Sequence, residues 1–160
     1  MSDPASITFG VVAPEQFATR AGIDILTDML SGEAPQAQVG KLLGFRLVEA
    51  ALGRAVFEGV PPAEFLNPFG TIAGGYHATI LDAALGCAIL SHLQPGNSMT
   101  TAEFKVTCLR PLTADTGTVR AEATALHAGR RLGAAEARLI DADGKLLAHA
   151  TTTCLILPVP

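Results

Sequence analysis

Apolar and polar residues alternate along two segments in the second half of the chain. The alternation runs through residues 101–108 and resumes from Thr118 onward. Two further strand-like runs, at about 132–140 and 145–157, are joined by Asp141-Ala142-Asp143-Gly144, a sequence typical of a hairpin turn. A period of two is the pattern of an antiparallel sheet with one buried face. The second half of the chain therefore predicts four antiparallel strands.

Two more strands are predicted in the first half. Residues 42–50 and 54–60 form strand-like runs separated by Ala51-Leu52-Gly53. This is hairpin spacing, with a glycine where a bulge or a positive φ is needed. Pro61-Pro62 ends the second run, because neither residue can donate a hydrogen bond to a neighbouring strand.

Between the two groups of strands lies one predicted helix, over about residues 75–93. It is apolar nearly all round, and a helix without a polar face is buried on most sides. Alanines at 121–125 and 134–137 fall on the inner face of two predicted strands, where small side chains let a sheet approach a helix closely. The predicted fold class is therefore α+β, with one curved antiparallel sheet wrapped around one long central helix.

The N-terminal region predicts a helical extension of this domain. Apolar residues recur at four-residue spacing over residues 14–31, and Gly32 follows as a stop signal. Residues 33–38 are predicted to be a linker. We therefore divide the chain into a helical extension with its linker at 1–38 and a main domain at 39–160.

The composition indicates a folded chain that associates with other copies of itself. Hydrophobic residues make up 49% of the 160 residues and charged residues only 16%. So few charges over a large apolar surface predict that another subunit covers part of the exterior. The net charge of −4 comes without a basic stripe, which argues against nucleic acid as a partner.

Three features of the sequence predict a cytoplasmic protein that does not enter membranes. The first residues lack a basic stretch followed by an apolar one, which argues against a signal peptide. The longest near-continuous apolar stretch, residues 78–90, is too short to span a bilayer. Cys87, Cys108 and Cys154 lie far apart in apolar segments, which predicts buried reduced thiols rather than disulfides or a zinc site.

Asp82 is the one acidic residue within the predicted apolar helix. A buried carboxylate is costly unless it has partners or faces a polar cavity, although Asp82 could also occupy a solvent-facing line of the helix. The preceding segment, Asn67-Pro68-Phe69-Gly70-Thr71-Ile72-Ala73-Gly74-Gly75, offers an amide and backbone N–H groups that can point into a cavity. These are the parts of an acyl-transfer site, unless the glycines serve only a tight turn into the helix.

The segment resembles the signature of hotdog-fold thioesterases of the phenylacetate-degradation (PaaI-like) type. That signature reads N-x-x-G-x-x-H-G-G, with an Asp seven residues after the second glycine. This chain carries Asn67, Gly70, Gly74-Gly75 and Asp82 at the same spacing, and the similarity extends over about residues 42–157. The resemblance implies a hotdog fold and hydrolysis of a small or aromatic acyl-CoA to the free acid and coenzyme A.

The resemblance also implies a role for each catalytic residue. Asp82 is the expected general base or nucleophile, and the Gly74 N–H is expected to polarise the thioester carbonyl. Asn67 is expected to hold the water or the thioester, from the subunit opposite Asp82. Thr101 matches a position that helps to place the water, although an ordinary strand hydroxyl fits this sequence equally well.

Further expectations concern the substrate and the assembly. Candidates for binding the substrate are Gly70, Gly75 and Phe69 near the catalytic residues and, for the phosphates of coenzyme A, Arg110, Arg130 and Arg131. These arginines lie next to predicted turns. The alternative is that they are solvated surface charges without a role in binding. We expect a homodimer with active sites at its interface, assembled further as a dimer of dimers. We expect no metal and no cofactor beyond the coenzyme A of the substrate.

The chain departs from the signature at one position, where Ala73 replaces the histidine before the glycine pair. This leaves a non-catalytic acyl-CoA binding module as an alternative, and a hotdog hydratase or dehydratase as a more distant one. Such a hydratase uses a histidine paired with an acid, and no histidine occupies the loop before the helix. His77 lies four residues further on, but in the helix, so we expect it not to replace the missing side chain.

Overall fold

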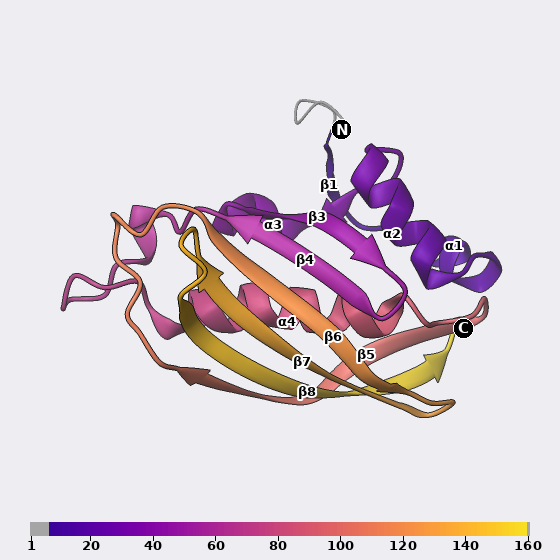
Figure 1. Ribbon diagram of the computed structural model, residues 1–160. Helices are drawn as coiled ribbons and strands as arrows, with labels where there is room; N and C mark the ends of the chain where they lie inside the picture. Colours follow the sequence, from indigo (N-terminus) through magenta and orange to yellow (C-terminus); the bar gives the residue numbers. More distant parts are fainter. Residues whose placement is uncertain (1–6, 160) are drawn as a thin grey trace.

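The computed structural model describes residues 7–159, and its largest element is an antiparallel sheet of six strands. The strands lie in the order β3-β4-β6-β7-β8-β5, so that β3 and β5 form the two edges (Figure 1). Their bounds are β3 (Phe45–Ala51), β4 (Arg54–Gly59), β5 (Asn97–Cys108), β6 (Val119–Ala128), β7 (Leu132–Asp141) and β8 (Leu146–Pro158). All six predicted strands are present, and their order along the chain is confirmed.

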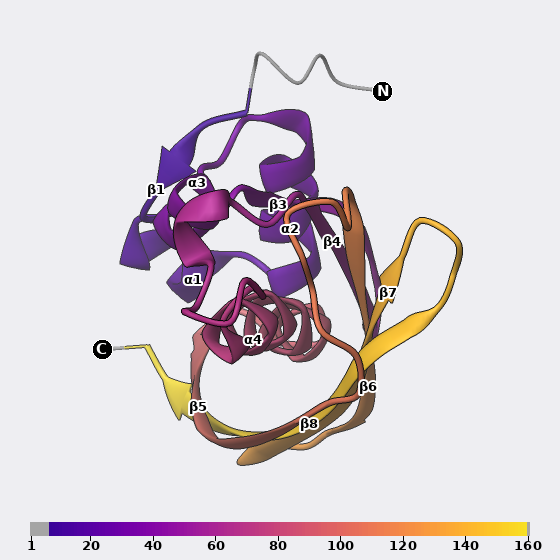
Figure 2. The ribbon, with the colours of Figure 1, turned by 90° about the vertical axis from the view of Figure 1, so that its left-hand side faces the viewer.

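The helix α4 (Gly74–Leu90) lies along the concave side of the sheet, as the end-on view in Figure 2 shows. The alanines of β6 and β7 that face inward are buried, namely Ala121, Ala123, Ala135 and Ala137. A Cβ atom added at Gly133 would lie 2.5 Å from Ile89 Cγ2, so small residues set how closely helix and sheet approach. The prediction of a curved sheet around one central helix is confirmed.

The N-terminal extension packs over β3 and over a side of α4 that the sheet leaves open (Figure 2). It contains α1 (Pro14–Thr19), α2 (Gly22–Ser31) and α3 (Gln38–Leu43), together with β1 (Phe9–Gly10) and β2 (Gln36–Ala37). Ile25 and Leu26 of α2 are fully buried, and Leu26 belongs to the main hydrophobic core. The extension therefore completes the core around α4.

The helix predicted over residues 14–31 is broken into two, and this prediction was wrong at the break. Arg20 and Ala21 have extended backbone conformations between α1 and α2. The break brings Gly22 onto the end of α4, where a Cβ atom would lie 1.8 Å from the Leu90 carbonyl oxygen. Close packing between distant segments therefore overrides the local helical periodicity.

The segment predicted to be a linker, residues 33–38, contains regular structure instead. β2 pairs in parallel with β1, and α3 begins immediately after it. The buried side chain of Gln36 binds both backbone groups of Leu47, accepting from its N–H at 2.7 Å and donating to its carbonyl at 3.2 Å. The strand predicted from residue 42 begins only at Phe45, because Gly44 ends α3 in the left-handed conformation with φ 69°.

Both predicted hairpin turns are confirmed. Gly53 and Gly144 have φ angles of 76° and 78°, a conformation that glycine adopts without strain. The Asp141 carboxylate stabilises the second turn by accepting hydrogen bonds from the N–H groups of Asp143 and Lys145.

The edge strand β5 is exposed along most of its length. Its alternation predicted one buried face, but Ala102 is exposed and Phe104 keeps 40% of its surface accessible. The register shifts between Thr101 and Glu103, which marks an irregularity in its pairing with β8. Cys108 at its end is also exposed, so the prediction of a buried thiol was wrong there. Proteins normally cover a long, partly apolar edge of this kind.

No helix within residues 7–159 is both long enough and apolar enough to cross a membrane.

Candidate active site

Asn67 shapes the loop that leads into α4. This loop follows a short 3-10 helix, η2 (Ala63–Phe65). Asn67 Oδ1 accepts hydrogen bonds from the N–H groups of Phe69 at 2.9 Å and Thr71 at 3.3 Å, and Asn67 Nδ2 donates to Thr71 Oγ1 at 2.8 Å. Gly70 turns the loop with a φ of 79°. The amide of Asn67 therefore binds its own loop within this chain.

The loop delivers exposed backbone donors at the start of α4. Ala73 is the N-cap residue and has no side chain that could cap the helix. The first N–H groups of a helix lack intrahelical acceptors. In the described part of the chain, neither Gly74 nor Gly75 donates a hydrogen bond from its N–H, and no atom lies within 4 Å of a Cβ built on either residue. These donors are open to a ligand at the positive end of the helix dipole.

A cavity of about 330 Å³ lies beside this helix start. Its lining comes from the Asn67 loop, from the first turn of α4 and from the segment that follows β5. The lining residues are Asn67, Thr71, Ile72, Gly74, His77, Cys108, Leu109, Arg110 and Pro111. The structure therefore brings together three of the predicted site residues, Asn67, Gly74 and Arg110.

Asp82 and Thr101 form a second part of the candidate site. Thr101 Oγ1 donates a hydrogen bond to Asp82 Oδ1 at 3.1 Å, from the edge strand β5 to the central helix. Asp82 is half-buried and has no ion pair among the described residues. It lies eight positions after Gly74, about 12 Å along the helix, and does not line the cavity. Within one chain, the carboxylate and the Gly74 N–H are therefore apart.

The cysteines near the site are unsuited to act as nucleophiles at neutral pH. Burial, followed by the negative charge of Asp82, raises the pKa of Cys87 to about 12. Burial also raises the pKa of Cys154, and partial desolvation of its sulfur raises the pKa of Cys108, which is an exposed residue of the cavity lining. Because the thiolate is the reactive form of cysteine, these groups stay protonated and weakly nucleophilic. Asp82 is the stronger candidate for the reacting group.

The remaining predicted residues are spread around the molecule. Phe69 is 91% exposed at the loop tip, and Gly75 lies at the helix start outside the cavity lining. Arg110 donates a hydrogen bond to the Leu146 carbonyl at the cavity. Arg130 and Arg131 are exposed in the β6–β7 turn, at the end of α4 opposite Gly74 (Figure 1). Their roles in binding substrate stay predictions.

His77 lines the cavity, although the sequence analysis expected it not to take the place of the histidine that Ala73 replaces. Its side chain is 98% buried, as only 2% of its surface is accessible, and neither ring nitrogen has a hydrogen-bond partner of acceptable geometry. Burial lowers the pKa of His77, whereas the nearby backbone carbonyls of Ala73 and Arg110 favour the protonated form. The sequence feature that could have indicated its place near Ala73 is the spacing, because residues four positions apart lie on one face of a helix.

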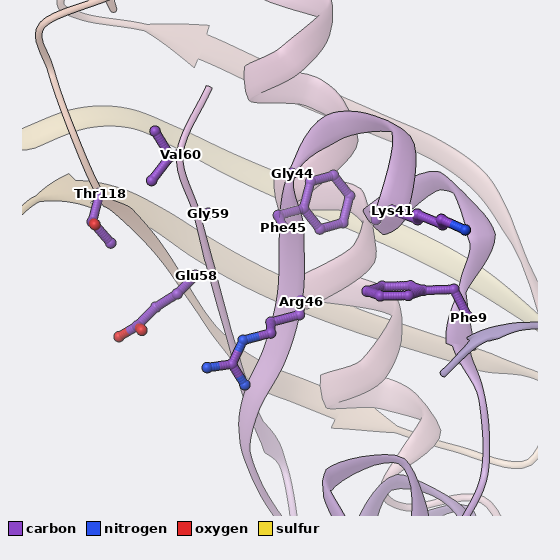
Figure 3. Close-up of a pocket in the computed structure, with 10 residues that line it drawn as sticks. Phe9, Lys41, Gly44, Phe45, Arg46, Glu58, Gly59, Val60 and Thr118 are labelled. Atoms are coloured by element: carbon purple, nitrogen blue, oxygen red, sulfur yellow. The ribbon is translucent and has the colours of Figure 1, made fainter. Parts of the chain in front are cut away.

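Another cavity, of about 350 Å³, lies between the N-terminal extension and the β3–β4 hairpin (Figure 3). Phe9, Phe45 and Val60 supply apolar lining, while Lys41 and Arg46 supply positive charge. None of the predicted site residues lines it. We therefore place the candidate site at the start of α4.

The chain is similar to known proteins in sequence and in structure. The model of the thioesterase superfamily matches residues 69–148, a span that includes Gly74, Asp82 and Thr101. A Saccharolobus solfataricus protein that is provisionally named an esterase is 31% identical over 120 residues, which are 75% of this chain and 84% of that protein.

Solved structures share the architecture. A phenylacetic acid degradation-related protein from Ralstonia eutropha JMP134 is 32% identical, with a TM-score of 0.74 over 82% of this chain and 98% of that chain. The PaaI protein of Escherichia coli is 23% identical, with a TM-score of 0.68 over 76% of this chain and 85% of that chain, which shows a common fold. The predicted hotdog fold is thereby confirmed.

Proposed function

Because the chain belongs to the thioesterase superfamily, we propose that it hydrolyses a small or aromatic acyl-CoA to the free acid and coenzyme A. The observation that carries this proposal is the Asp82 carboxylate, which Thr101 holds at 3.1 Å on an otherwise apolar helix. Asp82 is partly exposed at the open edge of the sheet and has no ion pair among the described residues, so its carboxylate is available to act as a base.

The proposed reaction uses the carboxylate and the helix start together. A water molecule attacks the thioester carbon while Asp82 accepts one of the water's protons. The carbonyl oxygen gains negative charge, which the Gly74 N–H and the positive end of α4 stabilise. The C–S bond then breaks, and the proton passes from Asp82 to the departing sulfur. Direct attack by the carboxylate through an anhydride, followed by hydrolysis, is the second route and gives the same products.

We propose that two protomers share each active site. Asp82 and the Gly74 N–H of one chain lie about 12 Å apart along α4, too far to act on one carbonyl group. Asp82 and Thr101 lie beside the open edge strand β5, whose apolar residue Phe104 is partly exposed. A second copy that covers this edge would place its own Gly74 cavity opposite Asp82. This arrangement is a homodimer, and our proposal includes its assembly as a dimer of dimers.

The proposed substrate accounts for the other features of the site. Ile72, Leu109 and Pro111 give the cavity apolar surface for an acyl group. Arg110, Arg130 and Arg131 are the proposed partners of the coenzyme A phosphates. The reaction as written needs no cofactor beyond the coenzyme A of the substrate. We propose that it takes place in the cytoplasm, where the three free cysteines of the chain would stay reduced.

Release of free coenzyme A from a panel of acyl-CoA thioesters tests this proposal. Asp82→Asn keeps the shape of the side chain but removes its basicity, so we expect kcat to fall at least about a hundredfold. Asp143→Asn is the matched control, because Asp143 is an exposed carboxylate in the turn between β7 and β8. Wild-type turnover that Asp82→Asn leaves intact would remove Asp82 from the mechanism.

A second candidate function is acyl-CoA binding without turnover. The observation that favours it is Ala73, which stands where the related signature has a histidine and has no side chain that could cap α4. This candidate predicts that calorimetry detects acyl-CoA binding while no thioester in the panel releases coenzyme A. Turnover of any acyl-CoA that depends on Asp82 excludes it.

A further inference from the structure

The imidazole of His77 is buried in the cavity with its hydrogen-bonding capacity unused. Only 2% of the residue is accessible. The backbone carbonyls of Ala73 and Arg110 lie near the ring, but no hydrogen bond joins either of them to a ring nitrogen. Buried polar side chains in folded proteins are nearly always hydrogen-bonded, and leaving one unsatisfied destabilises the fold. Because His77 also lines the cavity at the start of α4, a ligand in that cavity is the natural source of the missing partner.

The position of His77 on α4 directs its ring toward the helix start. Side chains on a helix lean toward its N-terminus, so the imidazole lies over the turn that contains Ala73 and Gly74. Gly74 lines the same cavity and has an N–H without a partner in the described part of the chain. Two donors from one helix therefore face one cavity.

The protonation state of His77 fits the role of a neutral donor. Burial lowers the pKa of His77, so the ring carries one N–H group and no charge at neutral pH. Besides His77, the titratable groups of the cavity lining are the exposed Arg110 guanidinium and the neutral Cys108 thiol, whose pKa is raised by partial burial. A neutral N–H at the positive end of the helix can donate to an oxygen that is gaining negative charge.

We propose that His77 is a carbonyl-binding residue, whose imidazole N–H donates a second hydrogen bond to the thioester oxygen that the Gly74 N–H binds. This inference rests on the proposed thioesterase function. It gives the protein a two-donor site for the oxygen, with one donor from the backbone and one from a side chain. Its ligand is a thioester carbonyl group rather than a polar substituent elsewhere on the acyl chain.

Two unreactive analogues of one acyl-CoA substrate test the inference by calorimetry. The first keeps the carbonyl group but has CH₂ in place of sulfur, and the second keeps sulfur but has CH₂ in place of the carbonyl group. His77→Phe removes the donor while filling the space. We expect it to weaken binding of the carbonyl analogue about tenfold and to leave binding of the thioether unchanged. His77→Gln, which retains an N–H donor, should recover part of the loss.

Matched measurements separate this role from a structural one. His149→Gln is the control, because His149 lies on β8 outside the cavity lining, and it should change neither affinity. In wild-type protein, the imidazole nitrogen resonances of His77 should shift when the carbonyl analogue binds and stay in place with the thioether. This NMR measurement needs no variant, so it tests the proposed hydrogen bond from His77 even if His77→Phe fails to fold.

Equal weakening of both analogues by His77→Phe would overturn the inference, as would unchanged binding of the carbonyl analogue. Identical resonance shifts with the two analogues would overturn it as well. The proposed function fails in a different way, through a wild-type protein that releases no coenzyme A from any acyl-CoA. The two failures are therefore distinguishable.

Discussion

Thr101 Oγ1 donates a hydrogen bond to the Asp82 carboxylate at 3.1 Å and so joins the edge strand β5 to the central helix α4. The bond orients the carboxylate at the open edge of the sheet, where the proposed second protomer would bring the substrate. Thr101→Val keeps the branched shape that suits a strand but removes the donor. We predict that it lowers kcat about tenfold, because a hydrogen bond to a charged group is lost.

Thr101→Ser is the matched variant, since it retains the hydroxyl group, and it should keep kcat close to that of the wild type. Steady-state release of coenzyme A from one acyl-CoA measures both variants. Equal rates for Val and Ser at this position would show that the hydroxyl group has no part in orienting Asp82.

The Gly74 N–H can be removed without changing the shape of the helix start. Gly74 is the first residue of α4, where proline is well tolerated, and Ala73 has φ −57° and ψ 143°, which suits a residue before proline. Gly74→Pro therefore removes the donor and little else. We predict a fall in kcat of about a hundredfold, measured by coenzyme A release.

Gly74→Ala is the control for this change, because it keeps the N–H and no atom lies within 4 Å of the added Cβ. It should retain most of the wild-type rate. If Gly74→Pro were as active as Gly74→Ala, the backbone donor would have no role in the reaction.

The sheet and its central helix were predictable because their signals are local. Each inner strand has one face against α4, so apolar residues recur at every second position, and Gly53 and Gly144 mark turns that need a positive φ. The break before Gly22 was not predictable, because it depends on contact with the Leu90 carbonyl, which lies far away in sequence. The exposure of Phe104 was also missed, since its alternation looks like that of a covered strand.

The candidate site was predictable where its residues lie close together in sequence. Asn67, Gly74 and Asp82 occur within one short motif, and their spacing carried the resemblance. The place of His77 in the cavity was not predictable in this way. The wall that encloses it includes Arg110 and Pro111, which follow β5, and only the folded chain brings them to the first turn of α4.

Arg130 and Arg131 test how the protein holds the phosphates of coenzyme A. We predict that replacing both with alanine raises KM for an acyl-CoA about tenfold, because charge-assisted hydrogen bonds to phosphate are lost. KM for the matching acyl-pantetheine thioester, which lacks the nucleotide phosphates, should stay unchanged. Arg138→Ala, at an exposed position on β7, is the control. Equal increases for both thioesters would contradict this role.

His77 makes the stability of the fold depend on pH. Burial lowers its pKa in the folded state, so below about pH 6.5 the unfolded chain takes up a proton that the folded chain resists. The contribution of neutral His77 to stability is complete above that pH and is lost as the pH falls toward the lowered pKa. We predict that the unfolding temperature drops more between pH 7.5 and pH 5 for wild type than for His77→Gln. Equal drops in the unfolding temperature of wild type and His77→Gln would contradict the effect of burial on the pKa of His77.

Mixed dimers test most directly whether Gly74 of one protomer works with Asp82 of the other. Gly74→Pro and Asp82→Asn protomers, co-expressed with different tags and purified as heterodimers, would contain one doubly altered site and one intact site. We predict that such heterodimers hydrolyse the acyl-CoA at about half the wild-type rate, while each parent dimer is nearly inactive. Heterodimers no more active than either parent would contradict a site shared between protomers.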